Sequence, residues 1–331
     1  MKKILIIQTA SIGDVILATP VLEKLHAFYP EARIGILIKK GTESLFESHL
    51  YLDKVYVWNK KGGKYKNLFA ILKQVRAEKY DLVVNIQRFF SSGLFTALSK
   101  GKETVGFAKN PLSVFYSKRF PHTIGEKGKP FKHEVDRNLS LIEHVTDTSF
   151  VCTKLYPTTE QFKKVSQYKT EKYICIAPTS LWFTKQFPKE KWIEFVNTLE
   201  PDLNIYFLGG NPDIEVCEAI IRESNHRKST NLAGKLTLLE SAALMQDAEM
   251  NFMNDSSPMH LASSMNANTT VIFCSTIPEF GFGPLAKNST IIQTSSDLPC
   301  RPCGLHGLKE CPQKHFACAN SITLSWTNQQ G

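Results

Sequence analysis

The chain has 331 residues, of which 42% are apolar and 21% are charged. This length suits two domains of ordinary size, and the composition allows each to bury a core, which excludes a mainly disordered chain. Lys and Arg outnumber Asp and Glu by 40 to 31, and the resulting net charge of +9 indicates an anionic partner. No apolar stretch reaches the ~18 residues of a membrane-spanning helix. Because Gln8, Thr9 and Asp14 interrupt the first apolar run, we expect a cytoplasmic protein without a signal peptide.

Short apolar runs alternate with helical patterns in the first half of the chain. The expected strands cover residues 3–8, 33–38, 55–58 and 81–86, with a weaker one at 103–106. This alternation predicts a parallel sheet wrapped by helices. Residues 110–131 are rich in Pro, Gly, Lys and aromatic residues without a clear period, so we expect a surface loop there. Helices are expected at 133–145 and 159–168.

The second half repeats this architecture. Strands are expected at residues 173–177, 204–208, 249–253 and 270–273, and helices beginning near Pro188, Pro212, Thr237 and Pro258 separate them. We therefore predict an α/β protein of two Rossmann-like, doubly wound domains, residues 1–165 and 166–331. Ligands of such sheets bind beyond the carboxyl ends of the strands, so the turns that follow strands are the places to look for chemistry.

The turn after the first expected strand carries an acid, Asp14, in the first turn of a helix that is expected to run to Leu25. Gly13 lets the backbone turn tightly just before it. Two interpretations remain open. The carboxylate complements the helix dipole, typically worth 0.3–1 kcal/mol, or it takes a proton from an acceptor hydroxyl. The glycine fingerprint of a dinucleotide site is missing from this turn.

Residues 254–262 form the corresponding turn in the second half. Ser257 suits an N-cap and Pro258 the first helical position, which leaves backbone N–H groups free to bind a diphosphate. Asp255 would accept a hydrogen bond from a sugar hydroxyl, and His260 would reach a phosphate or sugar oxygen. A plain capped helix is the alternative, but it explains neither the acid nor the histidine.

Two more turns carry charged side chains. Lys185 lies among hydroxyl and aromatic residues in the turn 178–188. It is either a solvated surface charge or a group that offsets charge on a leaving diphosphate, a contact worth roughly 3–4 kcal/mol. In the turn 209–215, Asp213 and Glu215 either hold ribose hydroxyls or occupy the first turn of a helix.

Together these turns resemble the heptosyltransferases of lipopolysaccharide synthesis, glycosyltransferase family nine, over nearly the whole chain. The resemblance rests on three segments in order: residues 11–20, with Ser-Ile-Gly-Asp and a later Pro, residues 185–188, and residues 255–260. It implies a GT-B fold, in which two Rossmann-like domains face a cleft, and an inverting displacement. It also implies an acceptor-binding first domain and a donor-binding second domain. Two departures are Ser257 in place of glycine and Leu181 in place of a second hydroxyl.

The resemblance assigns residues to roles. Asp14 is implied as the catalytic base and Lys185 as the residue that contacts the donor diphosphate. The implied donor site consists of Ser180, Lys185, Glu215 (preferred to Asp213), Leu236 near the adenine, Asp255, Ser256, Ser257 and His260. The implied function is heptose transfer from ADP-heptose to the inner core of lipopolysaccharide, at the cytoplasmic face of the inner membrane. No cofactor is required for this chemistry, and we expect a monomer without a nucleic-acid partner.

An anionic acceptor would give the positive charge a purpose. Lys60, Lys61, Lys64 and Lys66 form a basic loop around two glycines, although such a run is also typical of a solvated loop. Further expected acceptor contacts are Gly13, Gln87 with Arg88, and His133 with Arg137.

Four cysteines crowd the end of the chain: Cys300, Cys303, Cys311 and Cys318. Their spacing is typical of a structural zinc site. Free thiols remain an equal alternative, because persistent disulfides are not expected in a reducing cytoplasm.

Other functions were weighed against this one. A family member that uses another nucleotide sugar or acceptor would share the same fold and chemistry. A basic nucleic-acid-binding protein would need a basic stripe with interleaved aromatic residues, whereas the charges here are dispersed. A nucleotide-sugar epimerase or dehydrogenase would need the missing glycine fingerprint.

Overall fold

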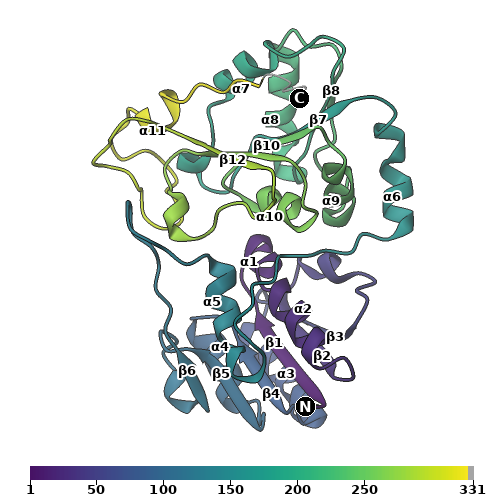
Figure 1. Cartoon of the computed structure of the whole chain (residues 1–331), viewed down its shortest axis with the longest axis vertical. Helices are drawn as coiled ribbons and strands as arrows, with labels where there is room; N and C mark the ends of the chain where they lie inside the picture. Colours follow the sequence, from purple (N-terminus) through teal and green to yellow (C-terminus); the bar gives the residue numbers. More distant parts are fainter. Residues whose placement is uncertain (327–331) are drawn as a thin grey trace. The chain divides into compact units, whose positions relative to one another are not determined.

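A computed structural model describes residues 1–326 of the chain, which form two separate sheets with helices around each (Figure 1). By its contacts the chain divides into a first unit, Met1–Gly125 with Lys132–Tyr156, and a second unit, Glu126–Phe131 with residues from Pro157 onward. The segment 157–165 therefore belongs to the second unit, whereas the sequence placed the boundary at residue 165. None of the helices described here combines the length and the apolar character needed to cross a membrane.

The first sheet has six parallel strands in the order β3-β2-β1-β4-β5-β6. They are β1 Lys3–Gln8, β2 Arg33–Lys39, β3 Leu52–Trp58, β4 Leu82–Asn85, β5 Glu103–Phe107 and β6 Lys118–Phe120. The order reverses between β1 and β4, which makes this the switch point where such sheets bind ligands. Strand β6 lies inside the stretch expected as a loop. That expectation was wrong because three residues, two of them charged, are too few to show an alternating pattern.

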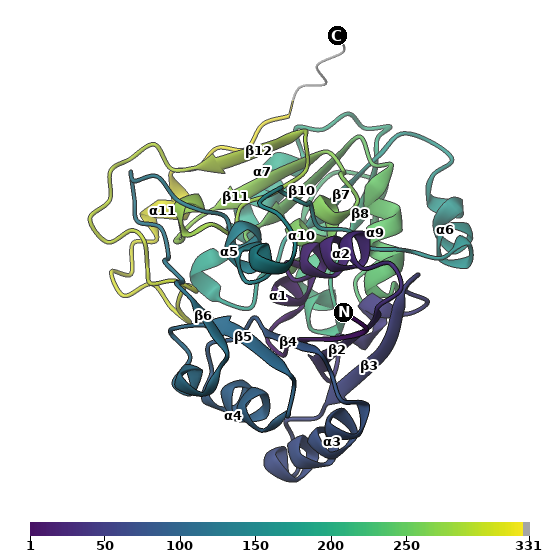
Figure 2. The ribbon, with the colours of Figure 1, turned by 60° about the horizontal axis from the view of Figure 1, so that its bottom comes forward.

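Helices cover both faces of the first sheet. They are α1 Ile12–Ile16, α2 Thr19–Phe28, α3 Lys64–Glu78, α4 Phe90–Leu98 and α5 Glu134–Ser140. Helices α3 and α4 share one face, and α2 and α5 lie on the other (Figure 2). The single helix expected through Leu25 is two helices. Pro20 has no N–H to donate to Ile16, so α1 ends and α2 begins with this proline in its first turn.

The second sheet repeats the winding in the order β12-β11-β10-β7-β8-β9, again with parallel strands. Its strands are β7 Tyr173–Ala177, β8 Asn204–Phe207, β9 Ser229–Asn231, β10 Met250–Asn254, β11 Thr269–Phe273 and β12 Ser289–Gln293. The switch point lies between β7 and β10. The sequence did not predict β9 and β12, because these edge strands are short or largely exposed and lack an apolar run.

The helices of the second unit are α6 Thr159–Val165, α7 Lys189–Val196, α8 Ile214–Glu223, α9 Leu238–Gln246, α10 Ser257–Ser264 and α11 Ala317–Asn320. Helix α7 packs beside α8, and α9 packs against α6 and α10. The core contains Trp192, Phe195 and Phe252, and the late residues Ala319 and Ile322 join it. The cysteine-rich segment is thereby anchored to the second unit.

Short 3-10 turns link these elements at Glu43–Phe46, Ser113–Phe115, Glu143–Val145, Ser166–Tyr168, Phe183–Lys185, Asn211–Asp213 and Pro278–Phe280.

Candidate active site

Asp14 lies in the turn at the carboxyl end of β1, beside the switch point of the first sheet. Ser11 caps helix α1, and its backbone N–H donates to Asp14 Oδ2 at 3.1 Å. The Ser11 hydroxyl donates to the same oxygen. Among the described residues, the hydrogen bonds of this carboxylate all go to Oδ2, so Oδ1 is left for a ligand. The carboxylate thus caps the helix and is also held in one orientation, and the two interpretations of Asp14 are compatible.

Neighbouring turns stabilise the turn that carries Asp14. The side chain of Gln87, at the end of β4, donates to Gln8 Oε1, which also accepts from the N–H of Ala10. Lys60 reaches across from the end of β3, and its Nζ donates to the carbonyl of Thr9 at 2.6 Å. Burial, together with the charges of Lys39 and Lys64, lowers the pKa of Lys60 to about 8. A buried glutamine and a lysine therefore fix the backbone that carries Asp14.

The residues expected to contact the acceptor differ in how accessible they are. Gly13 is buried within α1, and Gln87 is 5% exposed and bonded to other turns. Lys64 is exposed at the start of α3, with its Nζ 5.9 Å from the ring centre of Trp58. Of these three, Lys64 is therefore the one that is free to meet a large anionic ligand.

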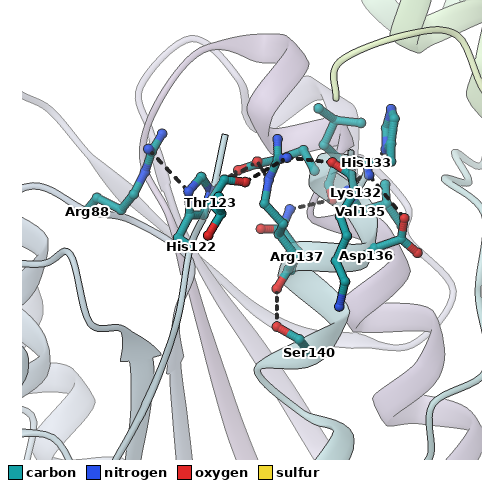
Figure 3. Close-up of polar contacts among 12 residues, drawn as sticks. Arg88, His122, Thr123, Lys132, His133, Val135, Asp136, Arg137 and Ser140 are labelled. Carbon is teal, nitrogen blue, oxygen red and sulfur yellow. Dashed lines mark hydrogen bonds and ion pairs between the residues drawn. The ribbon is translucent and has the colours of Figure 1, made fainter. Parts of the chain in front are cut away.

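Arg137 is buried and holds the base of a loop (Figure 3). Its Nε donates to Glu134 at 2.6 Å, and its Nη1 donates to the carbonyls of Lys132, at 2.5 Å, and Thr123, at 3.3 Å. One guanidinium thus ties together both ends of the loop 124–131. The arrangement commits Arg137 to this loop instead of presenting it to an acceptor.

A buried histidine extends this network toward the switch point. His122 Nε2 lies 3.1 Å from a carboxylate oxygen of Glu134, and His122 Nδ1 lies 3.5 Å from a guanidinium nitrogen of Arg88 (Figure 3). Burial raises the pKa of Glu134, but the hydrogen bond from His122 and the charge of Arg137 outweigh it, so the pKa is lowered overall. His133 caps α5 through its ring, which accepts from the N–H of Val135.

In the second unit, the turns after β7 and β10 meet at the switch point. Asn254 joins them, because its side-chain amide donates to the carbonyl of Pro178 at 2.6 Å and accepts from the N–H of Phe187 at 2.9 Å. Ser256 adds a weaker bond to the carbonyl of Thr179. Two segments that the sequence separates by some seventy residues therefore form one site.

The centre of this site is an ion pair between Lys185 and Asp255. The two groups lie 2.7 Å apart, and their side chains are 15% and 8% exposed. Thr276, after β11, donates to the same oxygen of Asp255 at 2.6 Å. Arg301 donates in turn to the carbonyl of Thr276 at 2.7 Å. A chain of contacts therefore runs from the cysteine-rich segment to the lysine.

Helix α10 begins one residue earlier than expected. Its N-cap is Ser256, with an extended backbone (φ −155°), and Pro258 is in the second helical position. Ser257 is thus the first helical residue and not the cap, because Ser256 makes the turn out of the strand. No side chain among the described residues caps the helix. Pro258 has no N–H and the N–H of Met259 donates to the carbonyl of Ser256 at 3.1 Å, so the N–H of Ser257 is the one left at this helix start. Such an N-terminus is suited to a phosphate. His260 is buried, one turn further along.

The remaining donor residues lie around this centre. Ser180 is half-buried, and its carbonyl accepts from Gln186 at 2.6 Å. The Asp213 carboxylate accepts a hydrogen bond from the N–H of Gly210 at 2.7 Å and so stabilises its own turn. Glu215 is exposed at the start of α8. This difference favours Glu215 over Asp213 for a ligand. Leu236 is half-buried in the loop before α9.

The four cysteines line one pocket of about 210 Å³ next to Thr184. Within residues 1–326, no group of three or more His, Cys, Asp or Glu side chains is arranged to hold a metal ion. Zinc binding, which their spacing suggested, is thus not shown by these residues. Burial raises the pKa of Cys318 to about 11 and also raises that of Cys303.

This cysteine-rich segment supports the lysine turn directly. Thr184 exchanges two hydrogen bonds with the backbone of Leu308, at 2.8 and 3.1 Å. A Cβ at Gly307 would lie 2.9 Å from Lys185 Cγ. Sequence reasoning missed Thr184, Thr276, Arg301 and Gly307, because each of them acts across a long sequence separation. The one signal in the sequence was Gly307 itself, a glycine between Cys303 and Cys311.

Comparisons with known proteins bear on the family and the fold of the chain. The sequence model of glycosyltransferase family 9 (heptosyltransferase) matches residues 68–312. Lipopolysaccharide heptosyltransferase 3 of Escherichia coli K12 is 27% identical over 281 residues, which cover 80% of this chain and 80% of that protein.

Solved structures share the fold. A family 9 glycosyl transferase from Veillonella parvula DSM 2008 has a TM-score of 0.77 at 23% identity, over 88% of this chain and 86% of that one. The ADP-heptose lps heptosyltransferase II of E. coli also has a TM-score of 0.77, at 17% identity, over 97% and 98%. The predicted GT-B class, with two Rossmann-like α/β domains, is thereby confirmed.

Proposed function

Because this chain belongs to glycosyltransferase family 9, the heptosyltransferases, we propose that it transfers a heptose from ADP-heptose to the inner core of lipopolysaccharide. It is a glycosyltransferase, and the proposal concerns the donor, the acceptor and the residues that act. The observation that carries the proposal is the Lys185–Asp255 pair at the uncapped start of α10. A cationic side chain and the start of a helix are both groups that bind a diphosphate.

Asp14 acts as the general base. Its carboxylate takes the proton from an acceptor hydroxyl while the hydroxyl oxygen attacks the anomeric carbon of the heptose. The bond from that carbon to the diphosphate breaks, and ADP leaves with the electron pair on its terminal phosphate. A single displacement of this kind inverts the anomeric centre. Ser11 supports this role because its two hydrogen bonds fix the carboxylate at the carboxyl edge of β1.

Lys185 stabilises the leaving group. Its ammonium neutralises charge that grows on the diphosphate, and the positive end of the α10 dipole assists. Asp255 keeps this ammonium in place before the donor binds. Glu215 binds the ribose hydroxyls, Leu236 packs near the adenine, and Ser180, Ser256, Ser257 and His260 complete the donor pocket.

The acceptor is an anionic oligosaccharide on a lipid anchor, which the chain meets as a monomer at the cytoplasmic face of the inner membrane. The net charge of +9 supports this assignment, as does the exposed Lys64. No bound cofactor takes part in this reaction scheme, because a carboxylate and a neutralised leaving group supply what an inverting displacement needs.

Purified full-length protein can test this function directly. Incubation with ADP-heptose and lipopolysaccharide that lacks heptose should release ADP and extend the core by one heptose, as measured by mass spectrometry. GDP- and UDP-sugars serve as competing donors, and thermal shift ranks them because a true donor stabilises the folded state by mass action. Stabilisation by a GDP- or UDP-sugar, without any by ADP-heptose, would replace the proposed donor with another nucleotide sugar.

A further inference from the structure

Four large apolar side chains are exposed on two segments of the first unit that contact each other, helix α4 and the 3-10 turn after β5. Phe89 and Phe90, at the start of α4, are 63% and 51% exposed, and Val114 and Phe115, in the 3-10 turn after β5, are 67% and 66% exposed. Such residues, here called the aromatic patch, are costly to leave in water when they are contiguous. Elsewhere in the first unit the exposed apolar residues are more scattered along the chain.

Asn110 links the two segments that carry the aromatic patch. Its side-chain amide donates to the carbonyl of Phe89 at 3.1 Å, and its Oδ1 accepts from the N–H of Leu112 at 3.0 Å. A Cβ at Gly93 would lie 2.2 Å from Asn110 Oδ1, so α4 and this turn pack closely around the asparagine. The two segments that carry these apolar residues are therefore tied together within the first unit (Figure 2 shows α4).

Two basic residues lie near the aromatic patch. Exposed Lys109 directly precedes Asn110. Arg119 pairs in register with Gly106, whose Cβ would point at Tyr116, so Arg119 is on the face that carries the patch. These two residues are here called the basic rim.

Negative charge is scarce nearby. Glu103 is the single acid of residues 88–120, and it is paired with Lys118 at 3.0 Å and His144 at 2.7 Å. The basic rim is therefore not neutralised by acids of its own segment.

We propose that the aromatic patch and the basic rim dock the chain on the surface of an anionic lipid bilayer. Aromatic side chains favour the headgroup region, where their apolar rings leave water, and nearby Lys and Arg side chains are attracted to anionic lipid. This inference rests on the proposed function, because it places the acceptor-binding unit against the bilayer in which a lipid-anchored acceptor is held.

A second copy of the chain fits this surface less well than an anionic bilayer does. A symmetric dimer through the patch would bring two basic rims together without acids between them, and like charges so close repel. An anionic bilayer instead satisfies both the apolar and the cationic parts of the surface.

Vesicle flotation with the full-length protein tests the inference. We expect binding to phosphatidylcholine vesicles that contain phosphatidylglycerol, weak binding to phosphatidylcholine alone, and release as salt is raised. The double variant Phe89→Ala/Phe115→Ala should lower partitioning about tenfold, and Lys109→Gln/Arg119→Gln should remove the dependence on anionic lipid. Leu50→Ala/Phe150→Ala is the matched control, because Leu50 and Phe150 are 72% and 49% exposed outside the patch.

Two results would overturn the inference. One is vesicle binding by Phe89→Ala/Phe115→Ala equal to that of the parent protein. The other is a dimer in light scattering that this variant converts to a monomer. Heptose transfer to a deacylated, water-soluble acceptor distinguishes membrane docking from the proposed function. Variants of the aromatic patch should retain this transfer activity, because the acceptor is not held in a bilayer. Failure of the parent protein to use any ADP-heptose acceptor, with vesicle binding intact, would count against the proposed function alone.

Discussion

Lys185 and Asp255 form a nearly buried ion pair at 2.7 Å, although seventy residues separate them in the sequence. The carboxylate also accepts from Thr276, so it stays hydrogen-bonded if the ammonium turns toward a diphosphate. The carboxylate of Asp255 therefore positions the ammonium of Lys185 before a donor binds. The strength of this ion pair must be balanced, because an ammonium bound too tightly to the carboxylate would not reach the donor.

Removing the ammonium should affect both stability and turnover. Lys185→Met leaves a buried carboxylate without its cation, and we expect it to lower the free energy of unfolding by about 2 kcal/mol. We also expect kcat to fall by roughly 10²–10³ and donor KM to rise, because the leaving group loses its neutralising charge. Urea unfolding and steady-state kinetics measure the two effects. Lys185→Arg is the control, and a Met variant with the parent kcat would exclude Lys185 from the reaction.

The cysteine-rich segment should control the lysine through Gly307. Gly307 has a φ of +79°, and a Cβ there would press on Lys185 Cγ at 2.9 Å. Gly307→Ala should therefore raise donor KM by roughly tenfold. Gly304→Ala is a matched control, because Gly304 has a φ of +66° but nothing within 4 Å of its Cβ position. Equal donor KM values for the two variants would show that the contact with Lys185 is unimportant.

Arg137, which holds both ends of the loop 124–131, should affect the free energy of unfolding at pH 7 and the way that it changes with acid pH. Arg137→Met leaves Glu134 buried beside His122 and should cost about 3–5 kcal/mol of unfolding free energy at pH 7. The folded-state pKa of Glu134 lies below its usual 4.5. Its stabilising effect is therefore present above pH 4.5 and is lost as the pH falls through the folded-state value.

Chemical denaturation at pH 7 and in acid distinguishes this variant from the parent protein. The gap in stability between the two proteins should narrow as the pH is lowered. A gap that stays constant down to the pH at which the parent protein unfolds would contradict the assignment of the shift to this pair.

A second acid-sensitive group lies in the first unit. His49 sits edge-on to Tyr51 and Tyr156, with ring centres 4.7 and 5.0 Å apart, and neither of its ring nitrogens is bonded to a described residue. Burial, with a smaller effect of His26, lowers the pKa of His49 from 6.5 to about 4. The unfolded chain therefore binds a proton between pH 6.5 and pH 4 that the folded chain does not bind.

Stability should fall across that window as the pH is lowered. The expected loss is on the order of 1–2 kcal/mol once partial solvent screening of the ring is allowed for. His49→Phe keeps the aromatic packing and removes the proton, so it should flatten the dependence between pH 6.5 and pH 4. An unchanged slope in this variant would assign the acid sensitivity to other groups.

Much of the fold could be predicted from the sequence because parallel strands in buried sheets are continuous apolar runs. Residues 3–8 and 173–177 are such runs, and both match strands in the structure. Strands β6, β9 and β12 could not be found this way, since edge strands bury little and need no apolar run. The break between α1 and α2 was missed because the apolar pattern continues across it, although Pro20, which has no N–H to donate to Ile16, marks it.

The sequence located the turns of the site but not the contacts within it. Asp14, Lys185 and Asp255 each follow a strand, and the end of a parallel strand is where ligands bind. The pairing of Lys185 with Asp255, and its support by Thr276 and Gly307, depends on which strands are neighbours. Local patterns carry no such information. The same limit explains Arg137, whose spacing from His133 on one helix gave no sign that it was buried with Glu134.

The role of Asp14 as the base is the central claim, and Asp14→Asn tests it most directly. An asparagine oxygen can still accept from Ser11, so the turn should keep its shape while the group loses its ability to take a proton. Donor affinity by calorimetry and single-turnover transfer of heptose should be measured on the same preparation. We predict an unchanged donor Kd and a transfer rate lowered by roughly 10²–10⁴. Transfer by Asp14→Asn at the parent rate would contradict the proposed mechanism.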